Sequence, residues 1–159
     1  SRELITRTLS EPDTLSFESD PLPRTIELSG RLSGTLDIEL NRQDVDLHVT
    51  AYEKLASGAY VQLFERYEFR ASYAGNRIQR RLLRAGERQT LAFEVERLAG
   101  RRLAAGSRLV LLMGVNKRPD REINYGSGKP VSEESIVDAR LPLRIRWFSD
   151  SYVDLPVGP

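Results

Sequence analysis

Side chains that could perform hydrolysis are few in this chain. A serine hydrolase needs a nucleophile, a base and an orienting acid, and His48 is the single histidine among the 159 residues. It occupies a polar position of an alternating segment, between Leu47 and Val49, so we expect it to face solvent from a sheet. No Gly-x-Ser-x-Gly segment is present. The sequence therefore predicts no catalytic triad and no catalytic residue within this chain.

Two closely spaced carboxylates could hold a cation. Asp44-Val45-Asp46 resembles the start of an EF-hand loop, but Leu55 stands where that loop needs a bidentate Glu. Asp44 and Asp46, with a backbone carbonyl, are the candidates for a calcium site, and the alternative is that both are simply solvated. One histidine and no cysteine disfavour zinc. We predict no metal and no cofactor.

Five arginines form a local basic cluster, at positions 77, 80, 81, 84 and 88. One interpretation is a charged arm that blunts a sheet edge. The other is a surface for an acidic partner or nucleic acid. We favour the first, because no aromatic residues are interleaved with the arginines as a stacking platform would need. The 24 basic and 23 acidic residues nearly cancel, so no overall field attracts nucleic acid or a membrane.

Most of the chain alternates apolar and polar residues with a period of two, which is typical of strands that bury one face. Turn formers separate these segments, for example Ser29-Gly30 and Ser33-Gly34. This pattern predicts an all-β jelly-roll sandwich with little helix. Helix is expected only as a turn or two over 96–103 and a short helix beginning in 132–135. The expected strands are 15–18, 25–29, 36–40, 45–51, 67–73, 91–95, 109–113 and 141–147.

Two segments depart from simple alternation. Leu109 to Met113 is apolar at every position, which predicts a strand in the middle of a sheet that is covered on both faces. Residues 116–131 have no period and contain two prolines and two glycines, so we expect the longest loop there. Loops of this length in compact domains usually serve a function or an interface.

The chain is expected to be one domain spanning residues 1–159, with residues 1–13 as a lead-in. The absence of an initial Met suggests a piece of a longer protein. No apolar run is long enough to span a bilayer, so we expect no membrane partner. The lack of cysteine and of a signal sequence favours a cytoplasmic location.

A set of ordered local patterns resembles the C-terminal domain of the X-prolyl dipeptidyl-peptidase and cocaine-esterase group of serine hydrolases. The resemblance extends from about Thr14 to Pro159. Its departures include the loop segment 116–120, where relatives more often have serines. The patterns are Leu15-Ser16-Phe17-Glu18-Ser19-Asp20-Pro21-Leu22, Gln43-Asp44-Val45-Asp46-Leu47, Phe69-Arg70-Ala71-Ser72-Tyr73, Asn124-Tyr125-Gly126-Ser127-Gly128 and Trp147-Phe148-Ser149-Asp150.

This resemblance implies a galactose-binding-domain-like jelly roll that packs against the α/β-hydrolase and cap domains of its own parent chain. Such a domain shapes the active-site entrance and supports stability or oligomerisation, so a homo-oligomer remains open. The parent is implied to be a dipeptidyl-peptidase or esterase. We expect the loop 116–128 to meet the hydrolase domain. The candidate interface residues are Asn116, Arg118, Asp120, Asn124 and Tyr125.

Two alternatives stay open. The first is a carbohydrate-binding jelly roll, perhaps with calcium, that holds sugars on Tyr60, Tyr125, Trp147 or Tyr152. Of these, Trp147 continues the apolar face of Leu143 and Ile145, so core packing is the better interpretation for it. The second is an oligomerisation domain without a ligand. In the leading interpretation we expect an exposed apolar face that the hydrolase domain covers.

Overall fold

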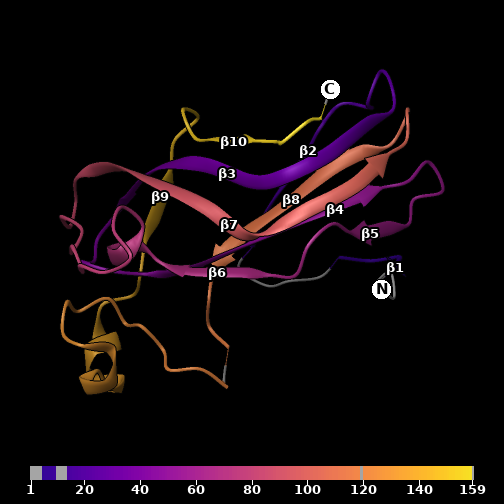
Figure 1. Cartoon of the computed structure of the whole chain (residues 1–159). Helices are drawn as coiled ribbons and strands as arrows, with labels where there is room; N and C mark the ends of the chain where they lie inside the picture. The colour runs from indigo at the N-terminus through magenta and orange to yellow at the C-terminus, as the bar shows by residue number, and fades with distance from the viewer. Residues whose placement is uncertain (1–4, 10–13, 119, 159) are drawn as a thin grey trace.

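The computed structural model describes residues 5–9, 14–118 and 120–158, and it is an all-β sandwich (Figure 1). The expected lead-in 1–13 lies partly outside these residues. Strands account for most of the regular structure, and the described helices are three short 3₁₀ segments. None of these segments is long and apolar enough to cross a membrane. The strands are β1 (Ile5–Thr6), β2 (Thr14–Glu18), β3 (Ile26–Leu40), β4 (Asp46–Lys54), β5 (Tyr60–Gln62), β6 (Tyr67–Arg70), β7 (Arg88–Leu103), β8 (Arg108–Val115), β9 (Ile145–Trp147) and β10 (Tyr152–Asp154).

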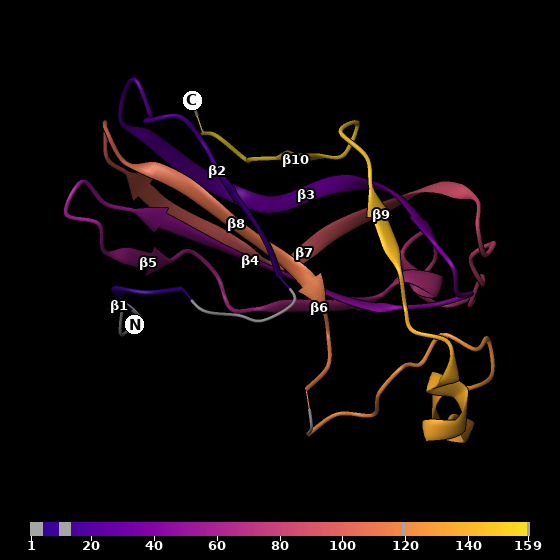
Figure 2. The ribbon, with the colours of Figure 1, turned by 180° about the vertical axis from the view of Figure 1, so that it is seen from behind.

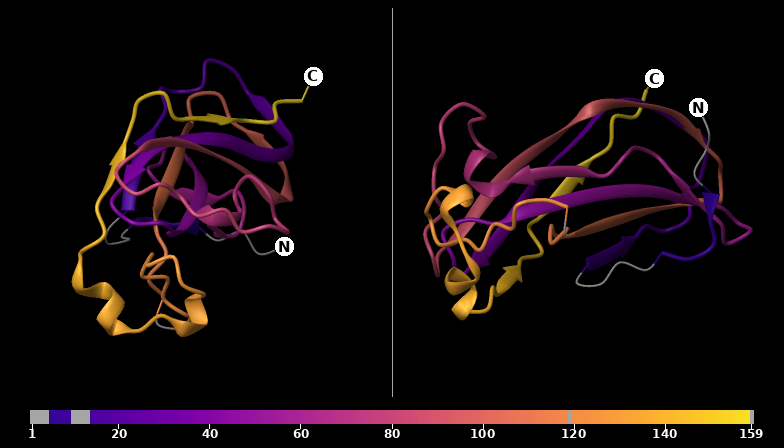
Figure 3. Two further views of the ribbon diagram at one scale, coloured as in Figure 1. Left: turned by 90° about the vertical axis from the view of Figure 1, so that its left-hand side faces the viewer. Right: turned by 90° about the horizontal axis from the view of Figure 1, so that it is seen from below.

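The strands form two sheets that lie face to face, as the views from behind and from the side show (Figures 2 and 3). The six-stranded sheet has the order β1-β5-β4-β8-β2, with β6 also paired to β4. The four-stranded sheet has the order β10-β3-β7, with β9 also paired to β3. Every described pair of strands is antiparallel.

The core lies between the two sheets. Alternate residues of β3 and β7 point into it from one layer, and alternate residues of β4 meet them from the other. This is the arrangement that the period-two pattern predicts. Trp147 packs against the same cluster, which confirms its expected role in the core. The fully or nearly buried members include Leu36, Ile38, Leu40, Leu47, Val49, Ala51, Leu91, Phe93, Val95 and Met113.

Strand β8 lies between β4 and β2, in the middle of the larger sheet. Val110 and Leu112 are buried on one face of it, and Met113 is buried on the other. The segment from Leu109 to Met113 is therefore a strand inside a sheet with buried residues on both faces, as its continuous apolar run predicted.

Four expectations about local structure are wrong. The predicted strand over 67–73 ends at Arg70, and the 3₁₀ helix η1 (Ala71–Tyr73) follows it. The predicted turns at Ser29-Gly30 and Ser33-Gly34 lie inside β3, which runs unbroken from Ile26 to Leu40. The predicted helical turns over 96–103 are strand, because β7 pairs with β3 from Arg88 to Leu103 around a bulge. The predicted strand over 141–147 is shorter and covers only β9.

Glycine occupies position 34 because atoms of neighbouring strands approach the backbone closely there. A Cβ at this position would lie 2.5 Å from the carbonyl oxygen of Tyr152 and 2.7 Å from the ring of Phe93. Glycine in a strand often marks such an approach of another backbone. The Ser-Gly pair therefore reflects the contact with β10 and not a turn.

Candidate interdomain interface

Residues 116–144 connect β8 to β9 and project from one end of the sandwich (Figures 1 and 2). The segment holds two 3₁₀ helices, η2 (Val131–Glu133) and η3 (Ile136–Arg140). The short helix expected to begin in 132–135 therefore takes the form of these two 3₁₀ turns. Long irregular segments on a rigid scaffold are common places for binding, so the contacts of this loop decide what the domain can do.

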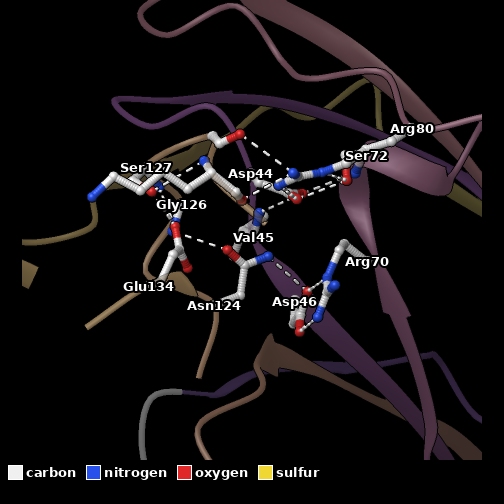
Figure 4. A network of polar contacts seen from close by, with 12 residues as sticks. Asp44, Val45, Asp46, Arg70, Ser72, Arg80, Asn124, Gly126, Ser127 and Glu134 are labelled. Atoms are coloured by element: carbon white, nitrogen blue, oxygen red, sulfur yellow. Dashed lines mark hydrogen bonds and ion pairs between the residues drawn. The ribbon is translucent and has the colours of Figure 1, made fainter. Parts of the chain in front are cut away.

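Asn124 anchors the middle of the loop to the sandwich (Figure 4). Its Nδ2 donates to Oδ1 of Asp46 at 2.9 Å, and its Oδ1 accepts a hydrogen bond from the backbone N–H of Gly126 at 2.9 Å. The backbone N–H of Gln43 donates to the carbonyl of Gly126 at 3.0 Å. The Asn124 side chain is buried. It therefore holds the loop in place, and its side chain is not exposed, although the sequence prediction placed it in the interface.

Glu134 braces the loop from the other side. Its carboxylate accepts the backbone N–H groups of Tyr125 and Ser127, each at 2.7 Å, and the hydroxyl of Ser127 at 2.5 Å. Buried polar backbone groups need such partners. The network in Figure 4 gives residues 124–127 a defined shape outside any helix or strand.

Asp44 and Asp46, the candidate calcium ligands, are paired with arginines. Asp44 is fully buried, and it accepts hydrogen bonds from the N–H of Ser72 at 3.0 Å, the hydroxyl of Ser72 at 2.7 Å and Nη2 of Arg80 at 3.0 Å. The two oxygens of Asp46 accept from Arg70 at 2.8 and 3.0 Å. This hydrogen bond raises the pKa of Arg70. The expectation that both carboxylates are solvated is wrong for Asp44, and arginines already compensate both charges.

The described residues contain no group of three or more His, Cys, Asp or Glu side chains placed to hold a metal ion. The calcium site considered for Asp44 and Asp46 therefore gains no further His, Cys, Asp or Glu side chain from the described part of the chain.

Of the remaining predicted interface residues, Arg118 and Asp120 are exposed, whereas Asn116 and Tyr125 are half-buried. Arg118 and Asp120 pair with each other at 2.7 Å on the surface, and this contact lowers the pKa of Asp120. Asn116 donates its backbone N–H to the carbonyl of Asp46 at 2.7 Å, and its side chain is half-buried. Asn116 and Asp120 line one depression of about 390 Å³ at the base of the loop. Tyr125 is half-buried and lies apart from this depression.

The sequence prediction missed the most exposed apolar residues of the loop. Ile136, Val137 and Leu141 have exposed fractions of 74%, 54% and 54%. The signal was present, because Ile136-Val137 and Leu141 are apolar in a segment without any period. The prediction stopped the candidate interface at Gly128 and therefore left them out.

The expectation that His48 faces solvent is wrong. Its exposed fraction is 2%, because both faces of β4 are covered along most of the strand. Burial, with a smaller contribution from the charge of Arg66, lowers the pKa of His48 to about 4. A neutral, buried imidazole within a sheet is a packing residue, so its altered pKa is no sign of a catalytic base.

The arginines of the basic cluster are spread over separate ion pairs. Arg77 pairs with Glu96, Arg80 with Asp44, Arg84 with Glu87, and Arg88 with both Asp37 and Asp150. Arg88 also lies over the ring of Phe148, with 4.2 Å to the centroid. Four of the five cations are thus compensated within the chain, which leaves little net positive charge for a nucleic acid.

The aromatic residues proposed for a sugar shelf lie on separate elements. Tyr60 is on β5, Tyr125 is in the loop, Trp147 is on β9 and Tyr152 is on β10. Tyr60 packs edge-on against Tyr52, with ring centroids 6.5 Å apart. A separate group forms where Phe69 stacks on Tyr67 and on Phe93, with centroids 5.7 and 5.6 Å apart. They line a groove of about 730 Å³, whose rim carries the Arg31–Glu94 and Arg77–Glu96 pairs.

Comparison with known proteins gives matches by structure only. No family model matches the sequence, and no curated protein matches it. Among solved structures, an α-amino acid ester hydrolase superposes with a TM-score of 0.79 at 20% identity, over 92% of this chain and 26% of that chain. An aminopeptidase from a marine sediment Thaumarchaeota archaeon has a TM-score of 0.81 at 15% identity, over 94% of this chain and 26% of that one. A CocE/NonD family hydrolase from Staphylococcus aureus has a TM-score of 0.65 at 15% identity, over 91% and 30%.

At these identities the likeness concerns the fold. This chain spans a quarter to a third of the length of each structural neighbour. The β-sandwich described here is therefore a fold that occurs as one part of larger hydrolases and aminopeptidases.

Proposed function

We propose that this chain is a non-catalytic accessory domain of a hydrolase that cleaves an ester or an amide. One observation carries the proposal: the sandwich matches nearly all of this chain but only 26–33% of the length of the chain in each of four solved structures, two of which are of the same hydrolase. All four are named as hydrolases or aminopeptidases. The family resemblance of the sequence points the same way, to an X-prolyl dipeptidyl-peptidase or cocaine-esterase-like parent with a catalytic serine.

The residues of this chain fit the role of a non-catalytic accessory domain. The only histidine is buried and neutral, so it is not available to activate a serine at neutral pH. The loop 116–144 is held in a fixed shape at one end of the sandwich, where it can contact a neighbouring domain. In this role the domain packs against the α/β-hydrolase domain, narrows the entrance to its active site and stabilises the enzyme or its oligomer.

The experiment compares the isolated chain with the full polypeptide from which it comes. Both receive an X-Pro chromogenic amide, an α-amino acid ester and a short-chain ester, with and without a fluorophosphonate that labels catalytic serines. We expect the full polypeptide to turn over at least one substrate and to take the label outside residues 1–159. Turnover or labelling of the isolated chain would overturn the proposal, and so would a full polypeptide that is neither active nor labelled.

A further inference from the structure

Three apolar side chains stand out on the loop at the end of the sandwich. Ile136, Val137 and Leu141, which we call the apolar platform, lie within six residues and are 74%, 54% and 54% exposed. They make up three of the ten large hydrophobic side chains that are exposed in the described part of the chain. Single exposed hydrophobic residues are ordinary, but a group of them marks an interaction surface.

The backbone beneath the platform is held firmly. Nη2 of Arg42 donates to the carbonyl oxygens of Asp138 at 2.6 Å and of Leu141 at 2.5 Å. Nζ of Lys129 pairs with the Asp138 carboxylate at 2.8 Å, and this contact lowers the pKa of Asp138. The backbone N–H of Ser135 donates to the same carboxylate at 2.9 Å. Together with the Asn124 and Glu134 contacts, these bonds fix the segment from both ends.

The arrangement is the reverse of what a loop in solvent requires. The carboxylates of Glu134 and Asp138 are used internally, whereas the apolar side chains of the platform are exposed. Each apolar side chain left in water forgoes the free energy of burying its exposed surface, and ordering the loop costs conformational entropy in addition. A rigid surface with apolar anchors loses little entropy on binding, which is the property of a docking site.

We propose that the apolar platform is the surface on which this domain docks against the hydrolase domain of the same polypeptide. The inference rests on the proposed function and adds to it the residues that make the contact. The occupant follows from the comparisons, because two thirds or more of each structural neighbour's chain lies outside the matched sandwich. The other exposed hydrophobic residues lie singly or in twos, with Leu15 and Phe17 on β2 and Ile78 and Leu82 between η1 (Ala71–Tyr73) and β7.

The test measures the accessibility of position 137 in the full polypeptide. The chain contains no cysteine, so Val137→Cys introduces one thiol into this domain. Val157→Cys is the matched control, because it has the same residue type and a similar exposed fraction, 49% against 54%. Val157 pairs with Leu28 near the start of β3, toward the end of the sandwich away from the platform (Figure 1).

Both variants are labelled with a small maleimide in native buffer and in urea, and the labelled peptides are quantified by mass spectrometry. We expect the native rate at position 137, relative to its rate in urea, to be about tenfold lower than at position 157, because a docked surface excludes the reagent. Equal rates would overturn the inference. If the same polypeptide is still labelled by the fluorophosphonate outside residues 1–159, the proposed function survives that result.

Dilution tests whether a second copy of the chain, and not the hydrolase domain, covers the platform. If the protection at position 137 disappears at low protein concentration, a second copy covers the platform and the inference is wrong. Protection by a domain of the same polypeptide does not depend on concentration. As a second readout, Val137→Asp should lower the thermal midpoint of the full polypeptide more than Val157→Asp does, and equal midpoints would contradict the docking role.

Discussion

Arg80 donates from Nη2 to Oδ2 of Asp44 at 3.0 Å, and the Asp44 side chain has no exposed surface. This ion pair connects the segment after η1 (Ala71–Tyr73) to the start of β4. The same guanidinium donates to the carbonyl of Lys129 at 2.9 Å, so the pair also reaches the loop 116–144. A buried carboxylate with this set of donors is a structural group whose charge the fold requires.

Asp44→Asn should therefore destabilise the domain strongly. The substitution removes the partner of a largely buried guanidinium and replaces an acceptor oxygen by an NH₂ group that faces other donors. We expect the free energy of unfolding in urea to fall by about 3–5 kcal/mol. Glu87→Gln is the control, because it breaks an exposed pair with Arg84 and should change the stability by less than about 0.5 kcal/mol. Similar losses in the two variants would contradict the role of Asp44.

Asn124→Ala should loosen the loop without unfolding the sandwich. It removes the hydrogen bond to Asp46 and leaves the N–H of Gly126 without its acceptor. We expect amide hydrogen exchange over 124–127 to become faster, corresponding to about 1–3 kcal/mol in the local opening free energy. The core strands β4 and β8 should keep their protection.

Asn76→Ala provides the comparison for Asn124. Its side chain accepts the N–H groups of Ile78 and Gln79 in an exposed turn, so its loss should affect exchange in that turn alone. If Asn76→Ala loosens residues 124–127 as much as Asn124→Ala does, the loop is not anchored by Asn124.

His48 should make the domain sensitive to acid. Burial lowers its pKa to about 4 in the folded state, whereas in the unfolded chain it takes up a proton near pH 6.5. Between these values only the unfolded state is protonated, so the free energy of unfolding decreases as the pH falls from about 6.5 to about 4. This one residue should contribute about 3 kcal/mol to the loss.

Two measurements check the acid sensitivity. Urea unfolding at a series of pH values should show a shallower pH dependence for His48→Gln than for the wild type, since carboxylates contribute equally to both. The ring proton resonances of the single histidine report its pKa directly by NMR. A midpoint near 6.5 in the folded protein would show that the imidazole is solvated after all.

Gly34→Ala should detach β10 from β3. The added methyl group would meet the Tyr152 carbonyl and the Phe93 ring, and neither can move without disturbing the sheet. Overpacking of this kind costs about 1–3 kcal/mol, which thermal unfolding would reveal. Gly75→Ala is the matched control, because no atom lies within 4 Å of the added Cβ. A Gly34→Ala variant as stable as Gly75→Ala would show that β10 can shift to accept the methyl group with little loss of stability.

Much of the fold followed from the sequence. The alternation of apolar and polar residues predicted strand β4 and a core packed between two sheets. The continuous apolar run predicted β8 in the middle of a sheet. These features depend on which face of a strand each neighbouring residue occupies, and that is a local property of the backbone. The failures at Ser29-Gly30, at Ser33-Gly34 and over 96–103 have a non-local cause. Turn and helix propensities of a few residues are weak, and the pairing of β3 with β7 overrides them.

The candidate interface was only partly predictable. Its general place, an irregular loop after β8, was visible in the missing period and the Gly and Pro content. The sequence could not show that Asn124 points inward to Asp46, because that contact joins residues 78 positions apart. It could not show that Ile136 and Val137 point outward either, since an apolar residue in an irregular segment has no fixed face.

By itself, the sequence determined that this chain is β-rich, and it predicted that no catalytic triad lies within it and that its longest irregular segment is the place to seek contacts. These conclusions follow from residue types and their local period. The tertiary structure alone decided that His48 is buried, that Asp44 is paired with Arg80 and that the apolar platform is exposed. Burial and ion pairing depend on which distant segments fold against each other, and a periodic pattern carries no information about that choice.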